Sequence, residues 1–103
     1  MVIGSDLVRV SRFAHWQDRR VLRVFGSAVL EQWHQQGRRT SYLASRWALA
    51  ESIYKAVGQW EICVNNAQGQ PVSQHCAVTV THDADLCWAL AIDRMLTQKK
   101  MTA

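Results

Sequence analysis

SYLASRWALAESIYKAVG, residues 41–58, has the clearest structural pattern in the chain, and the other segments are arranged around it. It holds no proline and several strong helix formers; Thr40 or Ser41 can cap its start, and Gly58 can end it. Placing its residues at intervals of about 100° gives one broad apolar face. The sequence therefore predicts a long helix over residues 41–57 that packs against the rest of the chain. The members of its apolar face are Leu43, Trp47, Ala50, Ile53, Tyr54 and Val57.

The segments before this helix are shorter. Residues 2–8 (VIGSDLV) are apolar and β-branched around one acid, which is typical of a short strand. Residues 17–25 and 27–36 have the pattern of two short helices separated by Gly26, and Gly37 ends the second. We therefore expect one strand and two short helices upstream of the long helix.

After the long helix the hydrophobic pattern changes to a period of two. Residues 60–65 and 76–81 are expected to form strands, with the turn sequence NAQGQP between them. The polar residues 82–85 (HDAD) then form a turn into a hydrophobic strand over residues 86–93. The order of one strand, three helices and three strands predicts an α+β fold rather than an alternating α/β fold. No repeat or linker interrupts the chain, so residues 1–103 are expected to form a single domain.

The composition is that of a globular domain. The 103-residue chain is 49% hydrophobic and 19% charged, and its longest apolar runs are well short of the roughly 20 residues that span a bilayer. Its first residues lack the features of a signal peptide, so we expect a cytoplasmic protein. The three cysteines have no Cys-x-x-Cys spacing, which favours buried thiols over a disulfide framework or a zinc site. They are Cys63, Cys76 and Cys87.

The net charge of +4 is concentrated in the first 46 residues. Eight arginines against three acidic residues give +5 there, whereas four basic against five acidic residues give −1 in residues 47–103. The planar guanidinium of arginine suits carboxylate and phosphate partners. Such a surface fits nucleic acid, an acidic protein or a phosphorylated cofactor, and charge alone does not choose among them.

Three polar residues stand where a purely structural sequence would use apolar ones: Asp6, Glu51 and His82. Each has a structural alternative, since Asp6 can cap a turn, Glu51 can pair with Lys55 along the helix, and His82 can be a turn residue. Two carboxylates without a nearby His or Cys cluster suit a hard cation such as Mg²⁺, held together with substrate phosphates. Spacing alone leaves these alternatives open. A nucleic-acid-binding domain would explain the arginines but neither carboxylate, and the chain lacks a basic–aromatic binding motif.

The ordered segments resemble the phosphopantetheinyl transferases, specifically the short holo-[acyl-carrier-protein] synthase type. The opening VIGSDLVRVSRF resembles the family's Gly-x-Asp strand and the basic segment after it. The helix YLASRWALAESIYKAVG resembles the signature Leu-Ala-x-Arg-Phe-Ala-x-Lys-Glu-x-x-x-Lys-Ala. NNAQGQPV resembles the Asn-x-x-Gly-Lys-Pro turn, and AVTVTHDADLCWALAI resembles the Val-Ser-x-Ser-His hairpin. Together these motifs cover most of the chain in the family's order.

This resemblance implies antiparallel strands packed on a long central helix and transfer of 4′-phosphopantetheine from coenzyme A to a serine of an acyl carrier protein. Asp6 and Glu51 would hold Mg²⁺ against the pyrophosphate of coenzyme A, and Lys55 would stabilise the departing 3′,5′-ADP. Glu51 and Lys55 are thus the expected catalytic residues. The related enzymes are homotrimers with sites between subunits, so we expect some of the five tryptophans at an interface. They are Trp16, Trp33, Trp47, Trp60 and Trp88.

The resemblance also implies which residues bind the nucleotide of coenzyme A and which bind the carrier protein. Thr79, Thr81 and His82 match the family's Ser-x-Ser-His and would line the nucleotide site. A basic surface near the N-terminus would meet the acidic recognition helix of the carrier protein. Its residues would be Arg12, Arg19, Arg20 and Arg23.

The sequence departs from the family pattern in three places. Ala50 stands where the family has a lysine directly before the metal-binding glutamate, and the usual Gly-Thr-Gly is reduced to Gly58-Gln59. Between Pro71 and Cys76 there is no room for the helix that many members insert. These departures favour an alternative, a non-catalytic relative that binds carrier protein or coenzyme A. They also raise the hypothesis that Ala50→Lys increases the transfer rate, unless Ala50 packs in the core or Arg46 already supplies the missing charge.

Overall fold

A computed structural model describes residues 2–95, and it contains the long helix that the sequence predicts over residues 41–57. This helix, α3, spans Thr40–Val57 and ends at Gly58, whose φ of 78° is left-handed. A 3₁₀ turn and two short helices precede it: η1 (Val10–Phe13), α1 (Asp18–Phe25) and α2 (Ser27–Gln35). The strands are β1 (Ile3–Arg9), β2 (Val64–Asn65), β3 (Pro71–Val72), β4 (Cys76–Asp83) and β5 (Leu86–Asp93). Among residues 2–95, no helix is long and apolar enough to cross a membrane.

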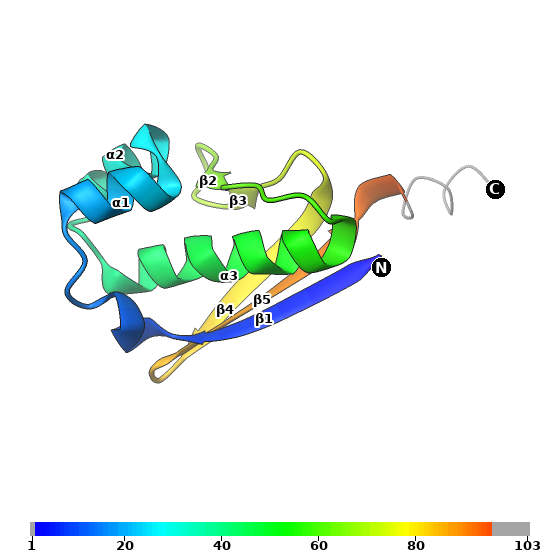
Figure 1. Ribbon diagram of the computed structural model, residues 1–103, viewed down its shortest axis with the longest axis horizontal. Helices are drawn as coiled ribbons and strands as arrows, with labels where there is room; N and C mark the ends of the chain where they lie inside the picture. The colour runs from blue at the N-terminus through cyan, green and yellow to red at the C-terminus, as the bar shows by residue number, and fades with distance from the viewer. Residues whose placement is uncertain (1, 96–103) are drawn as a thin grey trace.

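A three-stranded antiparallel sheet packs against α3 (Figure 1). Its strand order is β1-β5-β4, so the first strand of the chain pairs with the last. Side chains alternate between the two faces of a strand, and the buried Gly4 and Val8 show which face of β1 meets the helix. Asp6 lies between them in this alternation and therefore also faces α3. The predicted α+β fold, with antiparallel strands on a long central helix, is confirmed.

Gly4 lets β1 approach α3 more closely than any other residue would. A Cβ atom at this position would overlap the carbonyl oxygen of Ser52 and lie 2.8 Å from the amide nitrogen of Ala56 and 2.9 Å from Cβ of Lys55. Atoms at such distances clash, so only glycine fits. The close approach brings Asp6, two residues further along β1, against the turns of α3 that carry Lys55.

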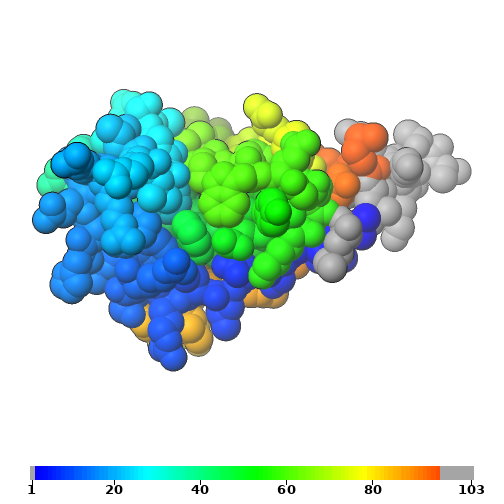
Figure 2. Space-filling model, viewed as in Figure 1, coloured from blue at the N-terminus to red at the C-terminus, as the bar shows by residue number. Residues whose placement is uncertain are grey.

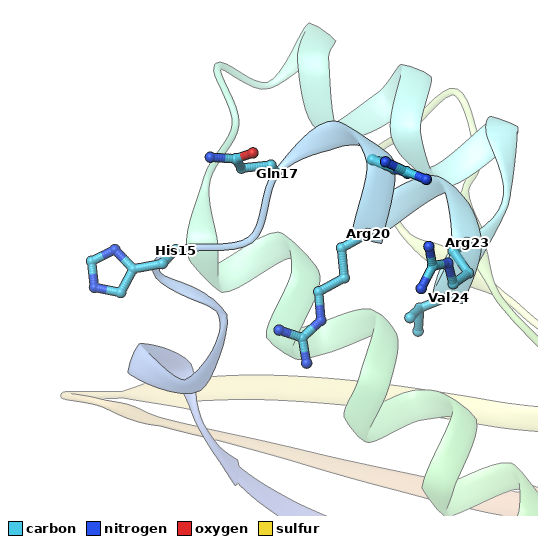
Figure 3. A pocket seen from close by; sticks show the side chains of 6 residues that line it. His15, Gln17, Arg20, Arg23 and Val24 are labelled. Carbon is cyan, nitrogen blue, oxygen red and sulfur yellow. The ribbon is translucent and has the colours of Figure 1, made fainter.

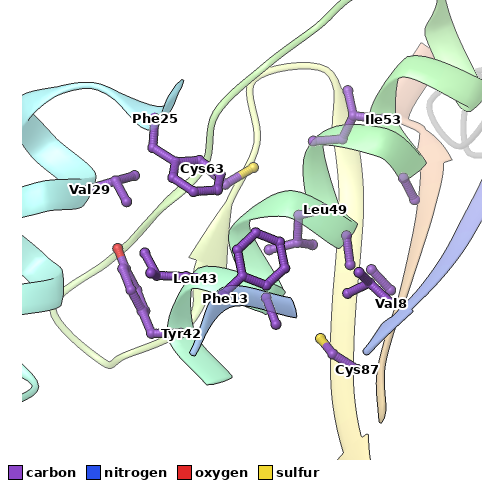
Figure 4. Packing of buried hydrophobic residues seen from close by; sticks show 14 of the residues in the cluster. Val8, Phe13, Phe25, Val29, Tyr42, Leu43, Leu49, Ile53, Cys63 and Cys87 are labelled. Atoms are coloured by element: carbon purple, nitrogen blue, oxygen red, sulfur yellow. The ribbon is translucent and has the colours of Figure 1, made fainter. Parts of the chain in front are cut away.

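The apolar face predicted for the long helix is wrong in part, because α3 is covered on more than one side. The sheet covers one side, and the same core cluster extends to the residues of η1, α1 and α2 (Figure 4). Leu43, Ala50 and Ile53 are buried as expected, and so is Leu49, which the predicted face omitted. Tyr54 is instead 53% exposed. The half-buried members are Trp47 and Val57.

The strand predicted over residues 60–65 is shorter in the structure. Only its last two residues are in β2, which pairs with the two residues of β3. Pro71 in β3 has no amide hydrogen to donate, and a two-residue partner cannot support a longer ladder. Residues 60–63 consequently form an irregular connection between α3 and β2.

The final hairpin is tighter than predicted. β4 continues to Asp83, so only Ala84 and Asp85 connect it to β5. Ala84 has a φ of 51°, the left-handed conformation that two-residue hairpins require. The carboxylate of Asp85 accepts hydrogen bonds from the backbone nitrogen (2.9 Å) and the hydroxyl (2.7 Å) of Ser11. These bonds attach the hairpin to η1, the turn that carries Arg12.

The three cysteines are buried free thiols, as the sequence predicts. Burial raises the pKa of Cys63 to about 12 and that of Cys87 to about 11. Both thiols therefore stay protonated at neutral pH and serve as small apolar side chains.

Candidate active site

The junction of β1 and α3 joins residues that are 49 positions apart in the sequence. The ammonium of Lys55 donates hydrogen bonds to the carbonyl oxygen of Ser5 (2.9 Å) and to Oδ1 of Asp6 (3.2 Å). The Asp6 side chain is only 17% exposed, whereas that of Lys55 is 47% exposed. The structure therefore joins β1 to this helix through Asp6 and Lys55, and the shared metal site of Asp6 and Glu51 stays a prediction.

Glu51 belongs to the same surface of α3. It lies one helical turn before Lys55 and is half-buried. On the face drawn in Figure 2, α3 (green) reaches the surface between β1 (dark blue) and the α1 region (light blue). Asp6, Glu51 and Lys55 thus provide two carboxylates and one ammonium around one junction, which we call the β1–α3 junction.

The donor set at the β1–α3 junction fits a hard divalent cation. Within residues 2–95, no cluster of three or more His, Cys, Asp or Glu side chains could hold a metal by itself. Mg²⁺ commonly takes only one or two carboxylates and completes its coordination with water and substrate phosphates. Asp6 and Glu51 would be those carboxylates.

Aromatic side chains flank Glu51 on the side of η1. Trp47 lies one turn before Glu51, and the guanidinium of Arg12 is 4.7 Å from the centre of its ring. Trp60 packs edge-on against Trp47, with 5.6 Å between ring centres, and is 46% exposed. Stacking on the ring holds the Arg12 guanidinium close to the β1–α3 junction while leaving its charge accessible.

The predicted basic surface is formed by α1. Arg19, Arg20 and Arg23 line a hollow of about 700 Å³ together with His15, Gln17 and Val24 (Figure 3). The Arg20 guanidinium lies 4.2 Å from the centre of the Trp16 ring. Among residues 2–95, no acidic side chain lines this hollow, so the lining carries net positive charge.

The one carboxylate of α1 is engaged elsewhere. Asp18 accepts a bond of 2.9 Å from Nε2 of His34 and lies 3.4 Å from Nη2 of Arg38. The hydrogen bond from His34, aided by the charge of Arg38, lowers the pKa of Asp18. Asp18 therefore ties α1 to the end of α2 and leaves the α1 arginines uncompensated.

His82 lies in a second cleft, which we call the His82 cleft. It has a volume of about 230 Å³ and lies between the start of α3, β4 and the β2–β3 hairpin. An imidazole nitrogen of His82 is 3.3 Å from the carbonyl oxygen of Ser41. The other polar residues of the lining are Gln36, Arg39, Tyr42, Ser45, Arg46 and Asn65.

Arg46 is the most unusual group of the His82 cleft, because it is a cation with an exposed fraction of only 2%. Its Nη1 donates to the carbonyl oxygen of Cys63 (3.2 Å), its Nε donates to the hydroxyl of Ser45 (3.2 Å), and its guanidinium lies 4.6 Å from the centre of the Tyr42 ring. Burial lowers its pKa, and within residues 2–95 no carboxylate forms an ion pair with it. A buried guanidinium without a counter-charge is suited to an anionic ligand.

The sequence did not lead us to Arg39 and Arg46 as members of this cleft. The available signal was an arginine, Arg46, among the small and apolar residues at the centre of the long helix. At about 100° per residue, Arg46 falls within the arc of the predicted apolar face, between Ile53 and Val57, so the spacing itself indicated a buried side chain.

Thr79 and Thr81 are not brought to His82 within one chain. Val80 and His82 line the cleft, and side chains alternate along β4, so both threonines point to the opposite face of the sheet. The register places Thr81 beside Trp88 and Thr79 beside Leu90 there. The alternation in Thr79-Val80-Thr81-His82 was the available sign of this separation.

Comparison with known sequences gives a consistent result. The chain is 31% identical over 96 residues to the holo-[acyl-carrier-protein] synthase of Mycoplasma mobile, covering 90% of this chain and 89% of that protein. It is 38% identical over 60 residues to the protein of the same name from Hydrogenovibrio crunogenus, covering 54% and 47% of the two chains. No protein-family model matches the chain.

The fold agrees with solved structures of the same class. The Helicobacter pylori holo-[acyl-carrier-protein] synthase, solved in complex with coenzyme A, superposes with a TM-score of 0.69 at 16% identity, covering 88% of this chain and 98% of that one. The Thermotoga maritima holo-[acyl-carrier-protein] synthase superposes with a TM-score of 0.68 at 21% identity, covering 89% of this chain and 62% of that one. The architecture is therefore that of the phosphopantetheinyl transferases. Together with the Mycoplasma mobile relative, it shows that the chain belongs to the holo-[acyl-carrier-protein] synthase family.

Proposed function

We propose that this protein transfers 4′-phosphopantetheine from coenzyme A to a serine of an apo acyl carrier protein, in the cytoplasm. The serine oxygen forms a bond to the β-phosphorus of coenzyme A, and the bond from that phosphorus to the bridging oxygen breaks. The products are the phosphopantetheinyl carrier protein, 3′,5′-ADP and one proton. The ion pair that joins Asp6 to Lys55 beside Glu51 is the observation that carries the proposal.

The β1–α3 junction is the proposed reaction centre. Mg²⁺ held by Asp6 and Glu51 would neutralise charge on the pyrophosphate of coenzyme A. Lys55 is half-exposed and carries three donors, so its ammonium can bond to the departing 3′,5′-ADP without leaving Asp6. Charge placed where the leaving group becomes more negative stabilises the transition state more than the ground state.

The His82 cleft is the proposed nucleotide site. Arg46 and Arg39 supply positive charge there, and His82 supplies an imidazole at its opening. The phosphate oxygens of the nucleotide would give the buried guanidinium of Arg46 the anionic partner that it lacks.

The α1 hollow is the proposed carrier-protein surface. Arg19, Arg20 and Arg23 face solvent, and no acidic residue of the described part of the chain lines the hollow. Arg12, held on the Trp47 ring, extends the positive surface towards the β1–α3 junction. An acidic helix bound here would place its serine near the reaction centre. Attraction of this kind acts mainly on the association rate and weakens with added salt.

We further propose a homotrimer in which the outer face of the sheet lies between subunits. This face is apolar and open: Leu7 is 59%, Ile3 46% and Trp88 44% exposed, and Leu7 pairs with Trp88 across β1 and β5. An apolar patch of this kind commonly marks an interface. Thr79 and Thr81 lie on the same face, so a neighbouring subunit could bring them to a shared nucleotide site.

The transfer proposal is tested by incubating the protein with coenzyme A, Mg²⁺ and a panel of apo carrier proteins. Mass spectrometry should find a phosphopantetheinyl group on the serine of at least one carrier, and none when Mg²⁺ is omitted. Coenzyme A binding without modification of any carrier would instead support the non-catalytic binding relative.

The trimer proposal is tested by light scattering on the parent chain and on Leu7→Lys. The parent should have the mass of three chains, and Leu7→Lys should shift it towards one chain without unfolding it. Val72→Lys is the matched control, since Val72 is 45% exposed on β3 and lies outside the sheet face. A parent of monomeric mass would contradict the proposal.

A further inference from the structure

Gln32 of α2 joins three segments that meet behind the His82 cleft. Its Nε2 donates to the carbonyl oxygen of Asn65 (2.9 Å), and its Oε1 accepts from the backbone nitrogen of Asn65 (3.0 Å). The amide thus pairs with both backbone groups of Asn65, as a neighbouring strand would. Oε1 also accepts a short bond of 2.6 Å from the Tyr42 hydroxyl. Gln32 itself does not line the cleft, whereas Asn65 and Tyr42 both do.

Tyr42 connects Gln32 to Arg46, because it bonds to Gln32 through its hydroxyl and contacts Arg46 through its ring. The Tyr42 side chain is 5% exposed, and Figure 4 shows its hydroxyl on the side of Val29 in α2. Its ring supports the Arg46 guanidinium at 4.6 Å, and its carbonyl oxygen accepts a 2.6 Å bond from the Ser45 hydroxyl, to which Arg46 also donates. The orientation of Arg46 therefore depends on where the Tyr42 ring is held.

We infer that Gln32 is a positioning residue for coenzyme A: through Tyr42 and Asn65 it holds Arg46 in the orientation that receives a nucleotide phosphate. This inference rests on the proposed nucleotide site in the His82 cleft. Both hydrogen-bonding atoms of the Gln32 amide are used, and each bond ends on a residue of the cleft wall. A buried hydroxyl that loses its acceptor must reorient to find another, and the ring that supports the guanidinium moves with it.

Loss of the Gln32 amide should therefore weaken binding of the nucleotide more than it affects other steps. Gln32→Leu keeps the size of the side chain and removes all three bonds. We expect the Kd for coenzyme A to rise about tenfold, the scale of one lost hydrogen bond to a charged site. The KM for the carrier protein should stay unchanged, because the α1 hollow shares no residue with this network.

The experiment measures the Kd for coenzyme A by calorimetry, both KM values, kcat and the melting temperature. The variants are Gln32→Leu, Arg46→Met, their combination, and Gln35→Leu as an exposed control on the same helix. In the Arg46→Met background, Gln32→Leu should add little to the loss of coenzyme A affinity. Tyr42→Phe removes only the hydroxyl bond and should raise the Kd in the same direction, which keeps the test valid if Gln32→Leu does not fold.

Each of the following results would overturn the inference. One is a lower melting temperature in Gln32→Leu and Tyr42→Phe with an unchanged Kd for coenzyme A. The other is a Kd increase from Gln32→Leu that is as large with Met at position 46 as with arginine. If the parent chain itself does not bind coenzyme A, the proposed function fails and the inference fails with it. If the parent binds and Gln32→Leu binds equally well, the inference alone fails.

Discussion

Ala50 occupies a position on α3 that solvent does not reach, with an exposed fraction of 0%. The family resemblance places a lysine here, and the sequence predicts a faster enzyme after Ala50→Lys unless the residue packs in the core. The structure favours the second outcome, because a lysine would crowd the core and desolvate its ammonium. We expect Ala50→Lys to lower the free energy of unfolding by about 1–3 kcal/mol and to leave kcat/KM for coenzyme A no higher.

Thermal unfolding and kcat/KM for coenzyme A, measured on the parent and on Ala50→Lys, check this expectation. Ala50→Ser is the control, since it adds one atom and no charge. A variant of unchanged melting temperature and raised kcat/KM would contradict it and show that the missing lysine limits the rate.

For single residues, the sequence predicted which side chains could take part in the reaction better than it predicted which side chains they contact. Asp6 and Glu51 were conspicuous because charges interrupted apolar patterns, and the structure joins Asp6 to Lys55, one helical turn after Glu51. Whether Lys55 pairs with Glu51 or with Asp6 depends on how close the strand comes, and helical spacing carries no such information. Arg46 was considered only as a substitute for the missing lysine at position 50, and its contact with the segment around Cys63, which is distant in sequence, was not predicted.

Gly4 controls the approach of two elements, and its substitution tests their coupling. Gly4→Ala would place Cβ against backbone atoms of α3, which can move only if β1 moves away. We expect a loss of about 1–3 kcal/mol in the free energy of unfolding, which lowers the melting temperature by roughly 4–8 °C per kcal/mol. The longer separation should also weaken the bond from Lys55 to Asp6.

Gly4→Ala should therefore have a lower melting temperature by calorimetry and a weaker Mg²⁺-dependent affinity for coenzyme A than the parent. Ala77→Ser, an exposed small-residue change on β4, should alter neither. A Gly4→Ala protein with parental stability and binding would show that the junction tolerates a wider spacing.

At the scale of elements, periodicity predicted the order and type of the main helices and strands. The long helix ended at Gly58 as expected, because a left-handed residue there follows from local chemistry. The predicted strand over residues 60–65 failed because strand formation depends on a partner, and β3 offers only Pro71–Val72. The predicted face of α3 failed because periodicity assumes one buried side, whereas the core extends on both sides of this helix.

For the whole molecule, the buried thiols set an alkaline limit to stability. Burial raises the pKa of Cys63 to about 12 and that of Cys87 to about 11, above the ordinary 9.0. As the pH rises through 9.0, the unfolded chain therefore loses its thiol protons before the folded chain does. Below pH 9.0 the free energy of unfolding should be insensitive to these thiols. Above it, the free energy of unfolding should fall progressively as the pH approaches the thiol pKa values of the folded protein.

Urea unfolding at neutral and alkaline pH measures this limit. The combined variant Cys63→Ala and Cys87→Ala should lose less stability between the two conditions than the parent does. An equal alkaline loss in both proteins would mean that other groups set the limit.

If the β1–α3 junction holds the reacting pyrophosphate, the transfer rate must depend on Mg²⁺ through Asp6 and Glu51. The initial rate is measured across a range of Mg²⁺ concentrations for the parent, Asp6→Asn, Glu51→Gln and the control Glu31→Gln, whose carboxylate is exposed on α2. We expect each junction variant to keep its melting temperature but to lose at least about 10²-fold in rate, while Glu31→Gln behaves as the parent. Parental rates with unchanged Mg²⁺ dependence in both junction variants would show that the pyrophosphate binds elsewhere.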